Sequence, residues 1–137
     1  MFKTTLITAA ALTFATTAFG AAHSELAVTA SDQDVSGGTV SAEAITAGAN
    51  GWLVVHRTDS EMKPGPVVAY APLKEGMNTD VAAILTEPVE SGEMLMLMLH
   101  AEDGGMETGI FEYTLGATED GPVRVDGNLV MTVVNAE

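Results

Sequence analysis

The chain has 137 residues with 19 acidic side chains, 5 basic side chains and no cysteine. The absence of cysteine excludes disulfides, thiolate metal sites and cysteine nucleophiles. The net charge of −14 argues against binding to nucleic acid or to an anionic membrane, because Lys and Arg are needed to bind phosphates. This length indicates one domain, and its hydrophobic core must stabilise the fold without covalent cross-links.

The first 22 residues have the pattern of a secretory signal peptide. Lys3 supplies a positive start, an apolar run follows over residues 6–19, and small residues stand before His23. We therefore expect a signal peptide at 1–22, a single domain at 23–137, and a periplasmic or secreted location. No later run approaches the roughly 20 apolar residues of a membrane span, so we expect no membrane insertion after cleavage.

After residue 22 the sequence has few helix signals and many short β patterns. These patterns alternate with turns rich in Gly, Asp and Pro, and the Asp126-Gly127 pair is the strongest hairpin signal among them. Such spacing predicts an all-β fold, an antiparallel β-sandwich of about 7–9 strands. The expected strands cover residues 25–31, 39–47, 52–58, 67–73, 80–86, 93–100, 110–115, 123–125 and 129–134.

Several segments resemble an uncharacterised domain of secreted and surface proteins from halophilic archaea and bacteria. They are "GWLVVHRTD", "PGPVVAYAPLKEGMNTDVAAILTEPV", "MLMLHAED" and "FEYTLGATEDGPVRVDGNLV", in the same order as in that domain. The resemblance covers most of residues 26–134. It implies an immunoglobulin-like sandwich outside the cytoplasm and no established activity, so no catalytic residue can be transferred.

The strand expected at 93–100 carries two kinds of apolar side chain. Side chains alternate between the two faces of a strand, so the leucines share one face; these are Leu95, Leu97 and Leu99. The other face carries Met94, Met96, Met98 and His100. If the leucines face the core, the methionines lie outside it, at an interface or along a groove. Methionine is usually a flexible filler of apolar space.

The same methionines also suggest a soft metal site. Thioether sulfur suits Cu(I), and His56 ends another apolar strand pattern, "WLVVHRT". If the two strands are neighbours, the imidazoles of His56 and His100 can meet. The candidate metal ligands are therefore Met94, Met96, Met98, His100 and His56, and copper is the one cofactor that we consider.

No catalytic motif stands out, so we do not expect an enzyme. The first hypothesis is a non-catalytic secreted or periplasmic module for binding or surface structure, with an unidentified protein partner or self-association. The alternative is a small periplasmic metal-binding protein, most plausibly for Cu(I). Convergence of the sulfurs of the methionine face and a histidine nitrogen on one point would favour the alternative.

The signal-peptide pattern generates a first prediction. In its native host the mature chain should begin at His23 or Ala21, because small residues precede both positions. Intact-mass measurement of the purified protein checks this. A mature protein that retains Met1 would contradict export through this segment.

Overall fold

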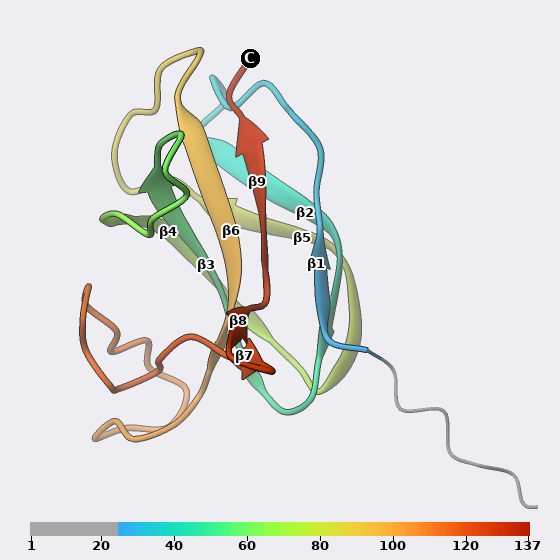
Figure 1. Ribbon diagram of the computed structural model, residues 1–137, viewed down its shortest axis with the longest axis vertical. Helices are drawn as coiled ribbons and strands as arrows, with labels where there is room; N and C mark the ends of the chain where they lie inside the picture. Colours follow the sequence, from blue (N-terminus) through green and yellow to red (C-terminus); the bar gives the residue numbers. More distant parts are fainter. Residues whose placement is uncertain (1–24) are drawn as a thin grey trace, which may run out of the picture.

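The computed structural model describes residues 25–137, so the predicted signal peptide at 1–22 lies outside the described residues. Two antiparallel sheets pack on each other, and a small hairpin lies beside them (Figure 1). The three-stranded sheet has the order β1-β2-β5, with β1 (Ala27–Thr29), β2 (Thr39–Ala47) and β5 (Gly76–Ile84). The four-stranded sheet has the order β4-β3-β6-β9, with β4 (Val67–Leu73), β3 (Gly51–Thr58), β6 (Met94–Ala101) and β9 (Met131–Asn135). The hairpin pairs β7 (Arg124–Val125) with β8 (Asn128–Leu129).

The predicted β-sandwich is confirmed, and most strand boundaries agree with the sequence patterns. Residues 25–137 contain no helix, and hence none long and apolar enough to cross a bilayer. Asp126 has the left-handed backbone (φ 51°) expected of its hairpin turn. β5 begins at Gly76, earlier than expected, and the pair Glu43–Asp80 (Asp80 φ 51°) is missing from an otherwise unbroken register with β2.

The core between the two sheets is entirely aliphatic. Leu53, Val55, Leu97 and Leu99 of the central strands point into it and are at most 2% exposed. They meet side chains from the opposite sheet such as Ile45, which is also fully buried. Since no covalent cross-link is available, this interdigitation provides the main stabilisation of the fold.

Trp52 packs outside the aliphatic core. It is buried, but its alternation with Leu53 places it on the opposite face of β3, away from the aliphatic core. Strand alternation, and not hydrophobicity alone, decides which face of a sheet a side chain occupies.

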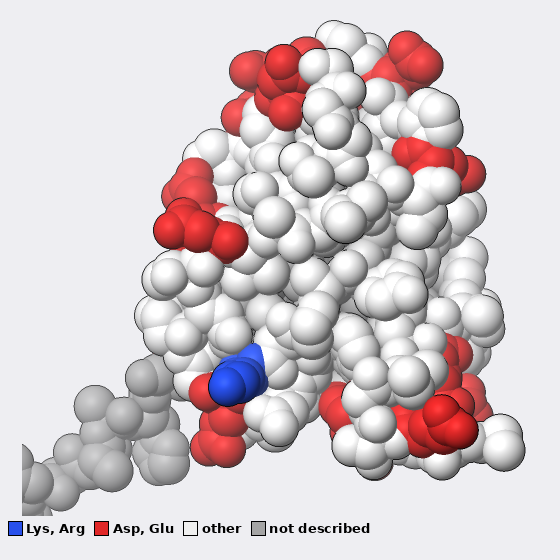
Figure 2. Space-filling model, turned by 180° about the vertical axis from the view of Figure 1, so that it is seen from behind, with Lys and Arg blue, Asp and Glu red and all other residues white. Residues whose placement is uncertain are grey.

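Acidic side chains lie mainly on the surface. In the view from behind, Asp and Glu gather at the ends and edges of the molecule, and the middle of that face is free of charge (Figure 2). A solvated arrangement of this kind avoids the large cost of burying carboxylates. Asp120 departs from it because this residue is fully buried.

The core packing gives a second prediction. Leu97→Ala should lower the free energy of unfolding by about 2–5 kcal/mol, because it leaves a cavity among fully buried side chains. Urea denaturation measures the change. Ile84→Ala is the matched control: Ile84 is 74% exposed, and truncating it should alter stability by less than about 0.5 kcal/mol. Equal losses in the two variants would contradict this assignment of the core.

Candidate metal site

The second face of the two central strands of this sheet, β3 and β6, is also buried. The pairing of β3 with β6 sets Trp52 opposite His100, and His56 opposite Met96. Both histidines and Met96 have no exposed surface. The expectation that the methionine face lies outside the core is therefore wrong in one respect: this face is a second buried layer.

A segment without regular structure covers this layer. Residues 102–122, here called the covering segment, run beside the four-stranded sheet on the side away from β1, β2 and β5 (orange in Figure 1). The strand expected at 110–115 does not form, because the backbone there pairs with no neighbouring strand. Its alternating Phe111 and Tyr113 pack as a cover over the sheet instead.

Carboxylates hold the covering segment in place. Glu102 accepts hydrogen bonds from the Trp52 indole Nε1–H (2.7 Å) and the Gly109 amide (3.2 Å). The Glu112 carboxylate accepts hydrogen bonds from the amides of Met106 and Glu107. Such bonds from charged acceptors are stronger than neutral ones, so the acidic residues here shape the cover as well as contributing charge.

All the Phe, Tyr and Trp side chains of residues 25–137 gather in this layer. Tyr70 of β4 and Phe111 stack with centroids 4.3 Å apart, and Trp52 lies 5.4 Å from Phe111. Tyr113 approaches the His100 ring edge-on at 4.6 Å and the His56 ring at 5.8 Å. The chain thus uses its large aromatic side chains to exclude water from the two histidines.

The two histidines meet inside this enclosure. His56 Nε2 and His100 Nε2 are 3.3 Å apart. The ring centroids lie 5.4 Å apart, well beyond the nitrogen separation, so the rings approach tip to tip. Such a meeting was predicted only if the two strands were neighbours, and β3 and β6 are neighbours.

Backbone carbonyls orient both rings. His56 Nδ1 lies 2.8 Å from the Gly65 carbonyl oxygen, and His100 Nδ1 lies 2.6 Å from the Asp120 carbonyl oxygen. A carbonyl only accepts, so each Nδ1 carries the proton that it donates. A side chain at position 65 would bring its Cβ within 2.7 Å of the Arg57 carbonyl oxygen, so glycine allows this close approach beside His56.

This arrangement leaves one polar contact unsatisfied in the neutral state. With both Nδ1 atoms protonated, the two Nε2 atoms carry lone pairs that face each other. If one ring takes the other tautomer, its Nδ1 lone pair faces a carbonyl oxygen instead. Every neutral combination therefore sets two acceptors against each other in a buried place, and a cation between the Nε2 atoms removes the conflict.

Burial keeps the pair neutral. It lowers the pKa of His100 to about 4. The hydrogen bond to the Asp120 carbonyl and the charge of the Asp120 carboxylate raise this pKa, whereas the charge of His56 lowers it. Burial also lowers the pKa of His56, while the bond to Gly65 acts in the opposite direction. At neutral pH both Nε2 lone pairs are therefore free to bind a metal ion.

The methionines divide by their place in the register. Met98 lies opposite Val54, between the positions of the two histidines, and Met96 lies opposite His56. Met94 lies at the far end of β6, opposite Thr58. Of the five candidate ligands, the structure therefore brings His56 and His100 together, places Met96 and Met98 on their buried face, and sets Met94 apart.

The geometry of the histidine pair matches a four-coordinate ion. Two nitrogens bound at about 2.0–2.1 Å to a tetrahedral metal lie roughly 3.3–3.4 Å apart, and the observed separation is 3.3 Å. Histidine ligands usually donate their other N–H to a carbonyl or carboxylate, as both rings do here.

Within the part of the chain that the structure describes, no group of three or more His, Cys, Asp or Glu side chains is arranged to hold a metal ion.

The groups that complete the enclosure were not predicted from the sequence. Tyr113 and the carbonyls of Gly65 and Asp120 come from irregular segments, and backbone acceptors leave no mark in a sequence. The segment "IFEYTL" did contain a signal, because it holds two of the few aromatic residues.

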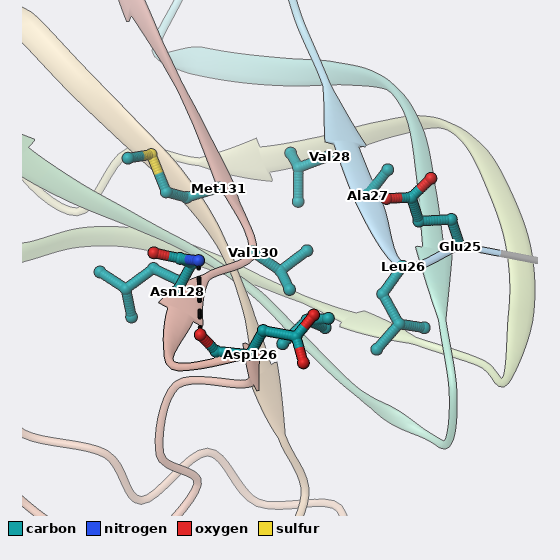
Figure 3. A pocket seen from close by; sticks show the side chains of 10 residues that line it. Glu25, Leu26, Ala27, Val28, Asp126, Asn128, Val130 and Met131 are labelled. Carbon is teal, nitrogen blue, oxygen red and sulfur yellow. Dashed lines mark hydrogen bonds between the residues drawn. The ribbon is translucent and has the colours of Figure 1, made fainter.

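A groove of about 380 Å³ lies elsewhere, between the start of β1 and the β7–β8 hairpin (Figure 3). Leu26, Val28 and Val130 line it, and the carboxylates of Glu25 and Asp126 lie near it. None of its lining residues is a histidine. Its composition identifies no ligand, so the histidine pair remains the candidate site.

The fold and the site thus define a class of protein: an all-β sandwich with a buried imidazole pair beneath an aromatic cover. The model of the domain of unknown function DUF7282 matches residues 26–137, and the chain belongs to this family. No curated protein and no solved structure matches the chain.

The lowered pKa values predict a stability that depends on pH. The unfolded chain takes up its histidine protons as the pH falls below about 6.5, whereas folded His100 resists protonation until about pH 4. Stability is therefore complete above pH 6.5 and falls between pH 6.5 and 4, by up to about 3 kcal/mol for His100. Urea denaturation of the metal-free protein at pH 7.5 and 4.5 measures this.

The double variant His56→Asn, His100→Asn is the control. An Asn amide can replace the Nδ1–H donor to each carbonyl, and the variant keeps every carboxylate. Its stability should change less over the same pH range. Identical profiles for wild type and variant would contradict the assignment of two buried neutral histidines.

Proposed function

We propose that this protein is a non-catalytic, exported module that holds one soft metal ion, Cu(I), between His56 and His100. One observation carries the proposal: two buried Nε2 atoms lie 3.3 Å apart while carbonyls engage both Nδ1 atoms. A cation is the partner that this pair of acceptors lacks.

The surroundings favour Cu(I) over a divalent ion. Thioether sulfur is a soft donor that suits Cu(I), and Met96 and Met98 are fully buried on the same face as the imidazoles. The cost of burying charge rises steeply with the charge, so an apolar enclosure disfavours a doubly charged ion that gains no carboxylate ligand. We propose a ligand set of two imidazoles completed by Met98 and Met96, with Met94 outside it.

The extracytoplasmic location and the finer fold assignment belong to the same proposal. The signal-peptide pattern before His23 supports export. The packing of a three-stranded on a four-stranded antiparallel sheet supports an immunoglobulin-like domain. A periplasmic or secreted protein meets copper outside the reducing cytoplasm, where it can hold the ion apart from other ligands.

A second candidate function is that of a partner-binding module without a metal. The outer surface of the covering segment exposes large apolar side chains, namely those of Met106 (95%), Ile110 (53%) and Leu115 (56%). Apolar side chains gathered on one loop favour contact with another protein or with a second copy. Sedimentation velocity over a range of concentrations tests self-association.

Anaerobic titration tests the copper proposal. The mature protein should take up one equivalent of Cu(I) in competition with a Cu(I) chelator. Trp52 fluorescence should change in parallel, because Trp52 is the cross-strand neighbour of His100. His100→Asn should weaken binding at least 100-fold, about 2.7 kcal/mol, because it removes one imidazole ligand. Zn(II) should bind far more weakly than Cu(I).

Two methionine variants refine the test. Met98→Leu keeps the apolar volume and removes the thioether, so it should weaken Cu(I) binding with little loss of stability. Met77→Leu is the control, because Met77 is 65% exposed on the other sheet. Binding by wild type no tighter than by His100→Asn would refute the proposal and leave the partner-binding module as the better hypothesis.

A further inference from the structure

Asp120 is a buried acidic residue whose contacts are unlike those of the surface carboxylates. It has no exposed surface, and its backbone lies in the left-handed region (φ 45°). Carboxylates are rarely buried without a compensating partner. Its role therefore requires an explanation beyond surface charge.

Each hydrogen-bonding group of Asp120 has a partner. Its amide donates to the Asp103 carbonyl (2.8 Å), and its Oδ1 accepts the Asp103 amide (3.0 Å). Its Oδ2 accepts the Glu112 amide (2.8 Å), and its carbonyl accepts His100 Nδ1–H (2.6 Å). One residue thus joins the two ends of the covering segment, binds its middle and orients one imidazole.

Asp120 lies where the covering segment rejoins the four-stranded sheet. Gly121 accepts the amide of Ala101 (2.9 Å), and Pro122 forms an isolated bridge with His100, so the chain after Asp120 lies along β6. Before Asp120, the segment carries Tyr113, which covers both imidazoles. The Asp120 carboxylate therefore holds the cover beside the point where the Asp120 carbonyl accepts the His100 Nδ1–H.

We infer that Asp120 is a positioning residue that couples closure of the covering segment to the metal-binding tautomer of His100, an inference that rests on the proposed function. With the segment closed, the Asp120 carbonyl holds the proton on Nδ1 and leaves the Nε2 lone pair directed at His56. With the segment open, His100 loses this acceptor and its tautomers interchange, so enclosure and ligand orientation are gained or lost together.

The variant Asp120→Asn tests this coupling with little change in backbone preference. Asn tolerates the left-handed conformation as well as Asp does, but its NH₂ group opposes one of the two amides that the carboxylate accepts. In ¹⁵N NMR spectra of the metal-free protein, His100 should be almost wholly the Nδ1–H tautomer in wild type and a mixture in the variant. Cu(I) transfer to an excess of chelator should be at least tenfold faster in the variant.

Two control variants separate this role from general loosening. Asp126→Asn changes an exposed aspartate of similar backbone conformation (φ 51°) and should match wild type in both measurements. Glu102→Gln weakens the bonds to Trp52 and Gly109 away from His100. It should leave both the Cu(I) transfer rate and the His100 tautomer close to those of wild type, because Asp120 still holds the segment closed beside His100.

Hydrogen exchange in the wild-type protein tests the inference even where Asp120→Asn does not fold. The Glu112 amide and the His100 ring Nδ1–H should exchange with solvent at rates that report one common opening. Independent exchange rates for these two protons would overturn the inference. So would an Asp120→Asn protein whose His100 tautomer and Cu(I) transfer rate equal those of Asp126→Asn. Absence of Cu(I) binding by wild type would overturn the proposed function alone, because the tautomer and exchange measurements need no metal.

Discussion

The antiparallel pairing of β3 with β6 is the interaction on which the rest of the structure depends. These two strands form the middle of the four-stranded sheet, and both of their faces are buried. One face supplies Leu53, Val55, Leu97 and Leu99 to the aliphatic core. The same register brings His56 and His100 onto the other face, where their nitrogens meet. A shift by one residue would exchange the two sets of side chains, so the fold and the candidate site depend on one register.

Burying both faces of one sheet requires two different covers. The β1-β2-β5 sheet covers the leucine face with regular strands and closely packed aliphatic side chains. The histidine face is covered by the irregular covering segment, whose amides donate hydrogen bonds to Glu102, Glu112 and Asp120. Hydrogen bonds to a few carboxylates open more readily than a hydrophobic core does, since irregular segments belong to the less stable parts of a fold. This difference suits the proposed metal site, because the cover can open to admit an ion while the sandwich stays folded.

The buried histidine pair is a costly feature for a protein without cross-links. Two neutral imidazoles that set acceptor against acceptor reduce stability, and a pair of apolar side chains of similar size would avoid that loss. Buried polar groups that conflict in this way are characteristic of functional sites, where a ligand completes the arrangement. The concentration of aromatic side chains around the pair fits the same interpretation, because they isolate it from water without supplying a competing charge.

The sequence by itself determined the strand-rich fold class and the residues on each face of the central strands. These follow from local rules: alternation along a strand, turn chemistry at Asp126-Gly127 and the apolar runs that must be buried. It also singled out His56, His100 and the methionines as candidate ligands. Which histidine meets which, and over what distance, depended on the neighbour relation of β3 and β6, a non-local property that no short pattern encodes.

Only the tertiary structure decided that the second face is covered. The segment "IFEYTL" has the composition of a strand, but no free strand edge pairs with it, and its aromatic side chains are buried as a cover. The carbonyls of Gly65 and Asp120 likewise came to orient the two imidazoles through the path of the backbone. Every residue carries a carbonyl, so the sequence gives no sign of which ones will face an imidazole; the folded path of the chain makes that choice.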